Sequence, residues 1–222
     1  MSAPLPMTNG RRVALVLGVP LAFALIAWMG LSEVAYAGLG SYPVRLSVPV
    51  RGGTVHLSAG SADVQVTQGA AADLRLTGTA RYSLIPSTVT WQASPSGVIL
   101  SPRCHFITGI CSFSLRAVLP AGKRVVLSDG SGNLAITGLA SPDVLVTDGS
   151  GNVTLTFSKV PARVRVSDSS GDVTVVLPPG PTRYRVYATT SSGNRVVHVP
   201  QGGGPGHTIT VTDGSGNVSV TN

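Results

Sequence analysis

The chain has 222 residues, of which 43% are hydrophobic, and it contains 27 Gly and 16 Pro. This length is enough for one sizeable core, and the many turn formers favour an all-β domain over long helices. Only 11% of the residues are charged, and fourteen of the sixteen basic residues are Arg, a bias typical of a GC-rich genome rather than of a surface that binds nucleic acid.

The N-terminal segment differs from the rest of the chain. Residues 13–31 form an uncharged run of 19 residues directly behind two arginines. As a helix this run spans about 28 Å, close to the thickness of a bilayer core. We therefore expect a single-pass membrane helix, with residues 1–12 in the cytoplasm, residues 32–43 as a linker and the β domain outside the cell. The alternative is a secreted protein cleaved after Ala37, which ends an A-x-A pattern.

Residues 44–124 are expected to form N-terminal β coils and a cap. The stretch "LSAGSADVQV", from Leu57 to Val66, has a Gly, then Asp63, then alternating valines, like the turns further along the chain. The segments after it break this pattern, as the terminal units of a repeat array often do. We expect the aromatic residues there to be buried packing residues, with a ligand site as the alternative: Tyr82, Trp91 and Phe106.

The chain has two cysteines, Cys104 and Cys111. In an exported protein, this spacing predicts one disulfide that closes a small loop. A zinc site would need a second pair of ligands with suitable spacing, and the sequence has none.

Residues 125–222 contain five similar turns, of which "SDGSGN" and "TDGSGN" are the clearest. A glycine followed by Asn or Asp recurs in steps of 19, 20, 22 and 23 residues. Fixed-period similarity of this size is the signature of a repeat architecture. The turn residues are Gly132, Asn133, Gly151, Asn152, Gly171, Asp172, Gly193, Asn194, Gly216 and Asn217.

Apolar residues alternate with polar ones on both sides of each turn, which is typical of half-buried β-strands. The predicted core face includes Val125, Leu127, Leu134, Ile136, Val144, Val146, Val153, Leu155, Val164, Val166, Val173, Val175, Ile209, Val211, Val218 and Val220. The opposite face carries Thr154, Thr156, Arg163, Arg165, Thr174, Arg183, Arg185, Thr210 and Ser219.

Two architectures fit two short strands per repeat. In an antiparallel meander or sandwich, the D-G-S-G turns would be hairpin loops. In a β-solenoid, each repeat is one coil, and equivalent residues stack about 4.8 Å apart. We favour the solenoid, because stacking gives a reason for the faithful repetition of the turn: the Asn and Asp side chains at its end would form a hydrogen-bonded ladder.

Besides a metal site at the two cysteines that would use His105, the turn aspartates are also metal-ligand candidates. Stacking would bring them into a column, where a calcium ion could offset their repulsion, although each turn is better explained as an Asx-type turn. These candidates are Asp129, Asp148, Asp168 and Asp213. We find no catalytic constellation and expect no cofactor: the four histidines are dispersed, and no phosphate loop or nucleophile elbow is present.

The repeated turns and their flanking alternating strands resemble the bacterial "putative adhesin" family, a β-strand-repeat domain of unknown function that is often tethered by one membrane helix. The resemblance rests on residues 129–133, 148–152, 168–172 and 213–217 and covers roughly residues 44–222. It departs at "TTSSGNRVV", where Thr190 replaces the turn Asp and Arg195 takes an apolar position. It implies a right-handed β-solenoid outside the membrane and carries over no catalytic residues.

We expect a non-enzymatic, exported surface protein that presents a polar β face for adhesion or for a partner in the cell envelope. The alternatives are an envelope-stress sensor that binds a peptide, lipid or wall fragment, and a solenoid enzyme acting on cell-wall polysaccharide.

The charge of the exported part suggests partners. Residues 38–222 carry fourteen basic and eight acidic residues, a net charge of +6, which favours an anionic wall polymer or lipid headgroups over nucleic acid, unless these arginines merely solvate the strands. A cell-envelope protein is a further candidate partner. The last coil along the chain shows no cap, so we also expect self-association through its open edge.

Overall fold

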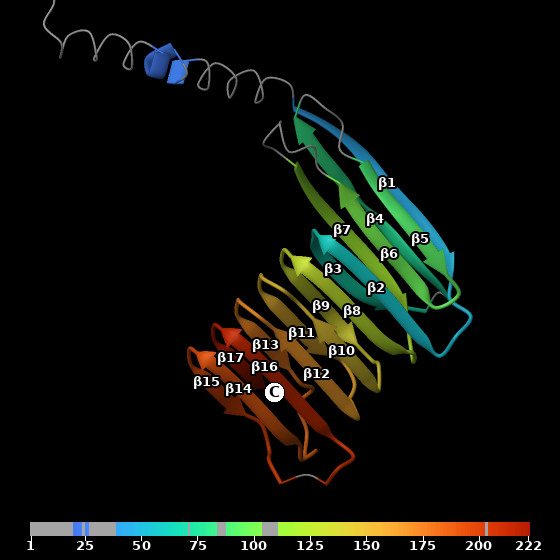
Figure 1. Ribbon diagram of the computed structural model, residues 1–222. Helices are drawn as coiled ribbons and strands as arrows, with labels where there is room; N and C mark the ends of the chain where they lie inside the picture. Colours follow the sequence, from blue (N-terminus) through green and yellow to red (C-terminus); the bar gives the residue numbers. More distant parts are fainter. Residues whose placement is uncertain are drawn as a thin grey trace, which may run out of the picture.

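The computed structural model describes residues 20–23, 25–26, 39–70, 72–83, 88–103, 111–202 and 204–222. These residues contain seventeen strands in two sheets, here called sheet A and sheet B (Figure 1). The all-β prediction is therefore confirmed. Among the described residues no helix is long and apolar enough to cross a membrane, and most of the predicted membrane segment, residues 13–31, lies outside them.

Sheet A has nine strands, in the order β1 (Leu39–Pro49), β4 (Asp73–Ser83), β7 (Cys111–Pro120), β3 (Asp63–Gly69), β9 (Leu134–Leu139), β11 (Val153–Phe157), β13 (Val173–Val176), β17 (Val218–Thr221) and β15 (Arg195–His198). Sheet B has eight, in the order β14 (Arg185–Ser192), β16 (Thr208–Ser215), β12 (Arg163–Asp168), β10 (Asp143–Thr147), β8 (Arg124–Ser131), β2 (Thr54–Ser61), β6 (Gly97–Arg103) and β5 (Thr88–Ser94).

Each repeat forms one coil: a strand of sheet B, the glycine-rich turn, and a strand of sheet A. Strands of adjacent coils pair in parallel, for example β8 with β10 and β9 with β11. The antiparallel meander is therefore wrong for this region, because the two strands that flank each turn belong to different sheets and make no hairpin. The stretch "LSAGSADVQV" forms coil β2–β3, which pairs in parallel with coil β8–β9.

The core lies between the two sheets, where the alternating apolar residues of both meet. All sixteen residues of the predicted core face are buried, each with at most 2% of its surface exposed. The residues between them point outward on both sheets. The half-buried strand pattern read from the sequence is thus confirmed coil by coil.

The N-terminal region departs from a simple solenoid. On sheet A, β1 pairs with β4 and β4 with β7, both antiparallel, and on sheet B β5 and β6 form an antiparallel pair. Both sheets are therefore mixed, and this region holds one regular coil, β2–β3, rather than several. β1 also begins at Leu39, inside the segment expected to be a linker.

The predicted aromatic packing residues that the structure describes, Tyr82 and Trp91, are not a buried cluster. Trp91, on the edge strand β5, is 49% exposed, so its predicted burial is wrong. The half-buried ring of Tyr82 lies 6.3 Å from that of Tyr42. Phe106 and Cys104 lie outside the described residues, and Cys111 begins β7. The disulfide therefore stays a prediction.

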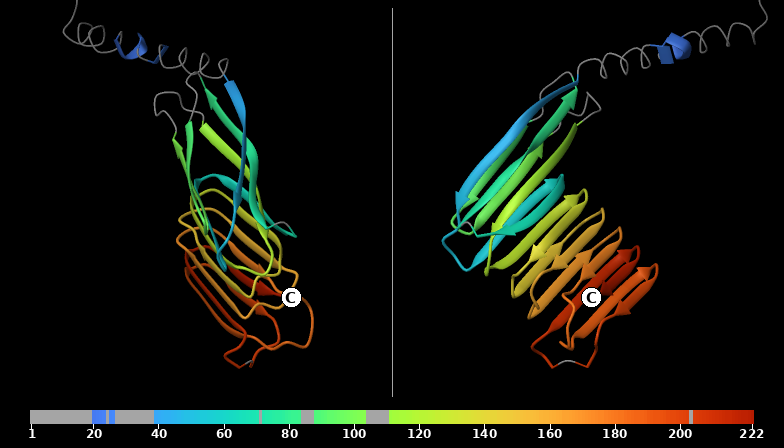
Figure 2. Two further views of the ribbon diagram at one scale, coloured as in Figure 1. Left: turned by 90° about the vertical axis from the view of Figure 1, so that its right-hand side faces the viewer. Right: turned by 180° about the vertical axis from the view of Figure 1, so that it is seen from behind.

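The coils do not stack in sequence order. Coil β16–β17 lies between coils β12–β13 and β14–β15, with which it pairs on both sides (Figures 1 and 2). The expectation that the last coil along the chain provides the open edge is therefore wrong: the edge coil is β14–β15.

Arg195 explains why coil β14–β15 suits the edge of the stack. It occupies the position that pairs with the core residue Val218, yet its own side chain is exposed. A charged residue at a core-side position of an edge strand is a known protection against pairing with a further strand. The departure of "TTSSGNRVV" from the repeat thus has a structural reason.

Candidate functional site

The glycines before each Asn or Asp form a continuous stack through the turns. Gly151 has a φ of 137°, which favours glycine. A Cβ added there would overlap the carbonyl oxygen of Gly132 in the next coil, and Gly171 has the same relation to Gly151. The Gly151 N–H donates to Ser170 in the following coil at 2.9 Å. The repeated glycine is therefore required by close contact between coils as well as by its own backbone conformation.

The residues after these glycines form the predicted hydrogen-bonded ladder on the exposed side of the turns. In each step, a backbone N–H of one coil donates to the side-chain Oδ1 of its neighbour. Asn152 donates to Asn133 at 3.2 Å, and Asp172 to Asn152 at 3.0 Å. In spatial order the ladder runs Asp63, Asn133, Asn152, Asp172, Asn217 and Asn194.

The two acidic members of the ladder each accept two hydrogen bonds from one asparagine. The backbone N–H and the side-chain amide of Asn133 donate to Asp63 Oδ1 at 2.9 and 3.1 Å. Asn217 makes the same pair of bonds to Asp172, at 2.8 and 3.0 Å. Charged acceptors strengthen such bonds, so these two carboxylates hold adjacent coils together.

The turn aspartates form a second column, on the buried side of the same turns. Asp129, Asp148, Asp168 and Asp213 are each at most 5% exposed. Each uses Oδ1 to accept an N–H of its own turn, such as that of Gly149 at 2.8 Å for Asp148. The Oδ2 atoms of the first three have no hydrogen-bond partner among the described residues.

Burial dominates the electrostatics of this aspartate column. It raises the pKa of Asp129 to about 7, and the neighbouring Asp148 carboxylate adds to that rise. Burial and a neighbouring carboxylate likewise raise the pKa of Asp148 and that of Asp168. Asp213 differs because its Oδ2 has a hydroxyl neighbour: Thr190 Oγ1 lies 3.2 Å from it and 2.9 Å from the carbonyl oxygen of Gly216, and its one proton can go to either acceptor. Thr190, which replaces the turn Asp, therefore ends the column with a donor.

The calcium site suggested for the aspartate column stays a prediction. Among the described residues no three or more His, Cys, Asp or Glu side chains are placed to hold a metal ion. The carboxylates already accept backbone N–H groups, and their burial favours the neutral acid over a charged ligand. The described histidines are not grouped either; His207 Nδ1 lies 2.9 Å from the carbonyl oxygen of Pro161.

The outer face of sheet A carries rows of polar residues that follow the strand register. One row runs through Arg45, Thr77, Arg116, Gln65, Ala135, Thr154, Thr174 and Ser219. Toward β1 the row carries arginines, whereas from β9 to β17 it carries only small uncharged side chains. The arginines of the regular coils lie instead on the outer face of sheet B: Arg124, Arg163, Arg165 and Arg185.

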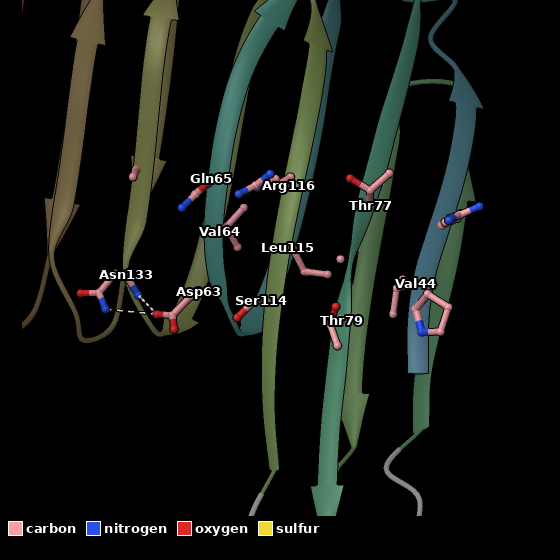
Figure 3. Close-up of a pocket in the computed structure, with 14 residues that line it drawn as sticks. Val44, Asp63, Val64, Gln65, Thr77, Thr79, Ser114, Leu115, Arg116 and Asn133 are labelled. Atoms are coloured by element: carbon pink, nitrogen blue, oxygen red, sulfur yellow. Dashed lines mark hydrogen bonds between the residues drawn. The ribbon is translucent and has the colours of Figure 1, made fainter. Parts of the chain in front are cut away.

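An open groove of about 910 Å³ lies over the arginine-bearing end of this face (Figure 3). Gln65, Arg116 and Thr77 lie at one level across the strands, and Asp63, Ser114 and Thr79 lie at the next. Gly78 lets β4 and β7 approach closely below them, because a Cβ there would overlap the carbonyl oxygen of Ser114.

Two residues of this groove, Asp63 and Asn133, were predicted from the sequence as turn residues, whereas its arginines were not predicted as a site. Their signal is an Arg between apolar residues in "VRL", "LRL" and "LRA", which shows that each Arg points outward from a strand. Only the strand order β1-β4-β7-β3 brings these arginines onto one surface.

The chain carries a repeat domain of recognised type. Residues 120–221 match the family described as Toastrack DUF4097, a domain of unknown function. The resemblance to the adhesin-like repeat family is thereby confirmed for this part of the chain. None of the curated proteins is significantly similar in sequence.

A solved structure shares the fold. A "putative cell adhesion protein" from Clostridium sporogenes is 13% identical, with a TM-score of 0.55 over 81% of this chain and 99% of its own. A "putative adhesin" from Bacteroides fragilis is 12% identical, with a TM-score of 0.34 over 81% of this chain and 97% of its own. At 13% identity the likeness to the C. sporogenes protein concerns the fold alone.

Proposed function

We propose that the protein is a non-enzymatic, exported surface protein that adheres through the outer face of sheet A. The observation that carries this proposal is the hydroxyl face from β9 to β17. Its outward residues are small and uncharged: Ala135, Thr137, Thr154, Thr156, Thr174, Val176, Ser219 and Thr221.

This face is held rigid by parallel pairing of four neighbouring strands. A rigid surface loses little conformational entropy on binding, and hydroxyl groups both donate and accept hydrogen bonds. Such a face suits a hydroxylated partner in the cell envelope. The adhesion-protein relative from C. sporogenes is consistent with a surface role. Export, through residues 13–31 as a membrane helix or by cleavage after Ala37, is part of the proposal.

The test measures sedimentation of the full chain with isolated cell-envelope particles. Thr154 and Thr174 are paired neighbours on the hydroxyl face. We expect the double variant Thr154→Arg with Thr174→Arg to weaken binding at least about tenfold, because the long side chains cover this face. Tenfold corresponds to about 1.4 kcal/mol of binding free energy. The matched control is Ser167→Arg with Thr212→Arg, a paired and exposed couple on sheet B. Equal binding by the parent and both variants would refute the proposal.

A further inference from the structure

We propose that the groove at the N-terminal end of sheet A binds an extended, hydroxylated polyanion, one segment of which lies across Arg45 and Arg116. This inference deepens the proposed function, because it assigns a ligand class to a second part of the same adhesive face. It rests on unpaired positive charge, on the donors beside that charge, and on the shape of the surface.

The arginines of the groove lack carboxylate partners. In the part of the chain that the structure describes, the only ion pair joins Arg124 to Asp143, on sheet B. Arg45 and Arg116 are exposed, and they lie on either side of Thr77 in one row. Two strand spacings separate them by about 10 Å. Arg75, also exposed, lies on the strand between them.

The carboxylate that lines the groove makes no ion pair with these arginines. Asp63 lines the groove, but both hydrogen bonds from Asn133 go to its Oδ1. Figure 3 shows these two bonds, which link Asp63 to the ladder between coils. The single negative charge of Asp63 remains, against the two positive charges of Arg45 and Arg116. The positive potential of the arginines is left to act on a ligand.

Neutral hydrogen-bonding groups surround the arginine pair. Thr77, Thr79, Ser114 and Gln65 line the same groove and are all exposed. A guanidinium binds phosphate or carboxylate through two parallel hydrogen bonds, and the hydroxyl and amide groups can pair with the hydroxyls of the same ligand. This combination matches a polyanion that carries hydroxyl groups along its length.

The shape of the site favours a polymer chain over a membrane surface. The groove is concave, whereas a bilayer presents a broad surface. Its large apolar lining residues Val44, Val64 and Leu115 are buried, and Pro43 is the exposed apolar residue of the lining. The groove therefore offers little apolar surface to enter a lipid layer. A single polymer molecule can instead lie across β1, β4, β7 and β3.

The test measures the affinity of the full chain for three probes: poly(glycerol phosphate), polygalacturonate and neutral dextran. We expect binding to at least one polyanion, weakening with added salt, and none to dextran. Binding of the phosphate polymer alone would identify a phosphodiester ligand, and binding of polygalacturonate a carboxylate ligand.

The variant Arg45→Gln with Arg116→Gln should weaken polyanion binding at least about tenfold, a loss of about 1.4 kcal/mol. The matched control, Arg163→Gln with Arg165→Gln, removes the same charge from sheet B and should bind like the parent. An equal loss in both pairs, or no polyanion binding, would overturn the proposal, as would arginine-dependent binding to anionic phospholipid vesicles without polymer binding.

Failure of this inference is distinguishable from failure of the proposed function. The Thr154→Arg, Thr174→Arg variant alters the hydroxyl face and leaves the groove residues unchanged. If that variant loses envelope binding and the parent binds no polyanion, the proposal of an adhesive hydroxyl face stands and the proposal of a polyanion-binding groove is rejected.

Discussion

Two columns of side chains pass through the same stacked turns, the exposed ladder that runs from Asp63 to Asn194 and the buried aspartate column. In the ladder, stacking places a backbone donor of one coil against a side-chain acceptor of the next, at 3.2 Å or less. In the buried column, stacking places carboxyl groups beside carboxyl groups, and three Oδ2 atoms remain unpartnered among the described residues.

The difference shows when repetition of a polar residue stabilises a stack. In the ladder, each side-chain oxygen meets a backbone N–H of the neighbouring coil, whether the acceptor is Asn or Asp. In the column, each ionised carboxylate offers only acceptors to the carboxylate of the next coil. Repetition therefore benefits the ladder and penalises the column, unless the aspartates keep their protons. The turn retains its Asp because Oδ1 accepts an N–H of the same turn.

The glycine stack supports both columns, so its disruption is the largest effect that we expect. Gly151→Ala should cost more than about 3 kcal/mol of unfolding free energy, or prevent folding, because the added Cβ overlaps a backbone oxygen. Gly138→Ala is the control: its φ of 71° is also left-handed, but no atom lies within 4 Å of the added Cβ. It should cost only about 1–2 kcal/mol. Equal losses in chemical denaturation would show that contact between coils is unimportant.

The buried column predicts an unusual pH dependence. The pKa of Asp129 is raised from its ordinary 3.8 to about 7, so the folded state keeps a proton that the unfolded state releases. This contribution to stability is fully present below about pH 4 and is lost as the pH rises through about 7. Asp129→Asn should flatten this dependence and add roughly 1–3 kcal/mol at neutral pH, the usual range for one unsatisfied buried group.

Asp172→Asn is the matched control for this prediction, because Asp172 is exposed in the ladder and already accepts two hydrogen bonds. Thermal unfolding from pH 4 to 8 should show the change in slope only for the Asp129 variant. Similar slopes in both variants would contradict the assignment of the pH dependence to burial.

The smallest expected effect concerns the interior of the ladder. Asn152→Ala removes the acceptor for the Asp172 N–H and should cost about 0.5–1.5 kcal/mol. Asn194→Ala should cost less, because Asn194 lies on the edge coil, beyond which the described part of the chain has no further coil. Denaturant unfolding of the two variants would test this gradient, and a larger loss for Asn194 would refute the ladder as a chain of equivalent bonds.

The sequence was sufficient where structure depends on local pattern. Period-two alternation identified the core valines, and the repeated Gly-Asn or Gly-Asp pairs identified the turns and the ladder. The sequence even placed Asp63 in a turn of the same kind, which the structure shows to be the first member of the ladder.

The remaining features depend on contacts between distant segments. Arg45 and Arg116 share a row only because β4 lies between β1 and β7, and no local pattern fixes that order. The place of coil β14–β15 at the edge was likewise not predicted, although Arg195 had been noted as a departure. Its exposure became meaningful only once its register partner, Val218, was known.

The interleaved position of coil β16–β17 has a consequence for how the fold is completed. Within the described residues, coil β14–β15 pairs in the sheets only with coil β16–β17. It therefore has no neighbouring strand to join until residues 208–221 have been synthesised. A simple repeat array can grow one coil at a time, but here the two coils beyond β12–β13 must be added together. Deletion of residues 208–222 would consequently disrupt two coils rather than one: it removes coil β16–β17 and leaves coil β14–β15 without its pairing partner.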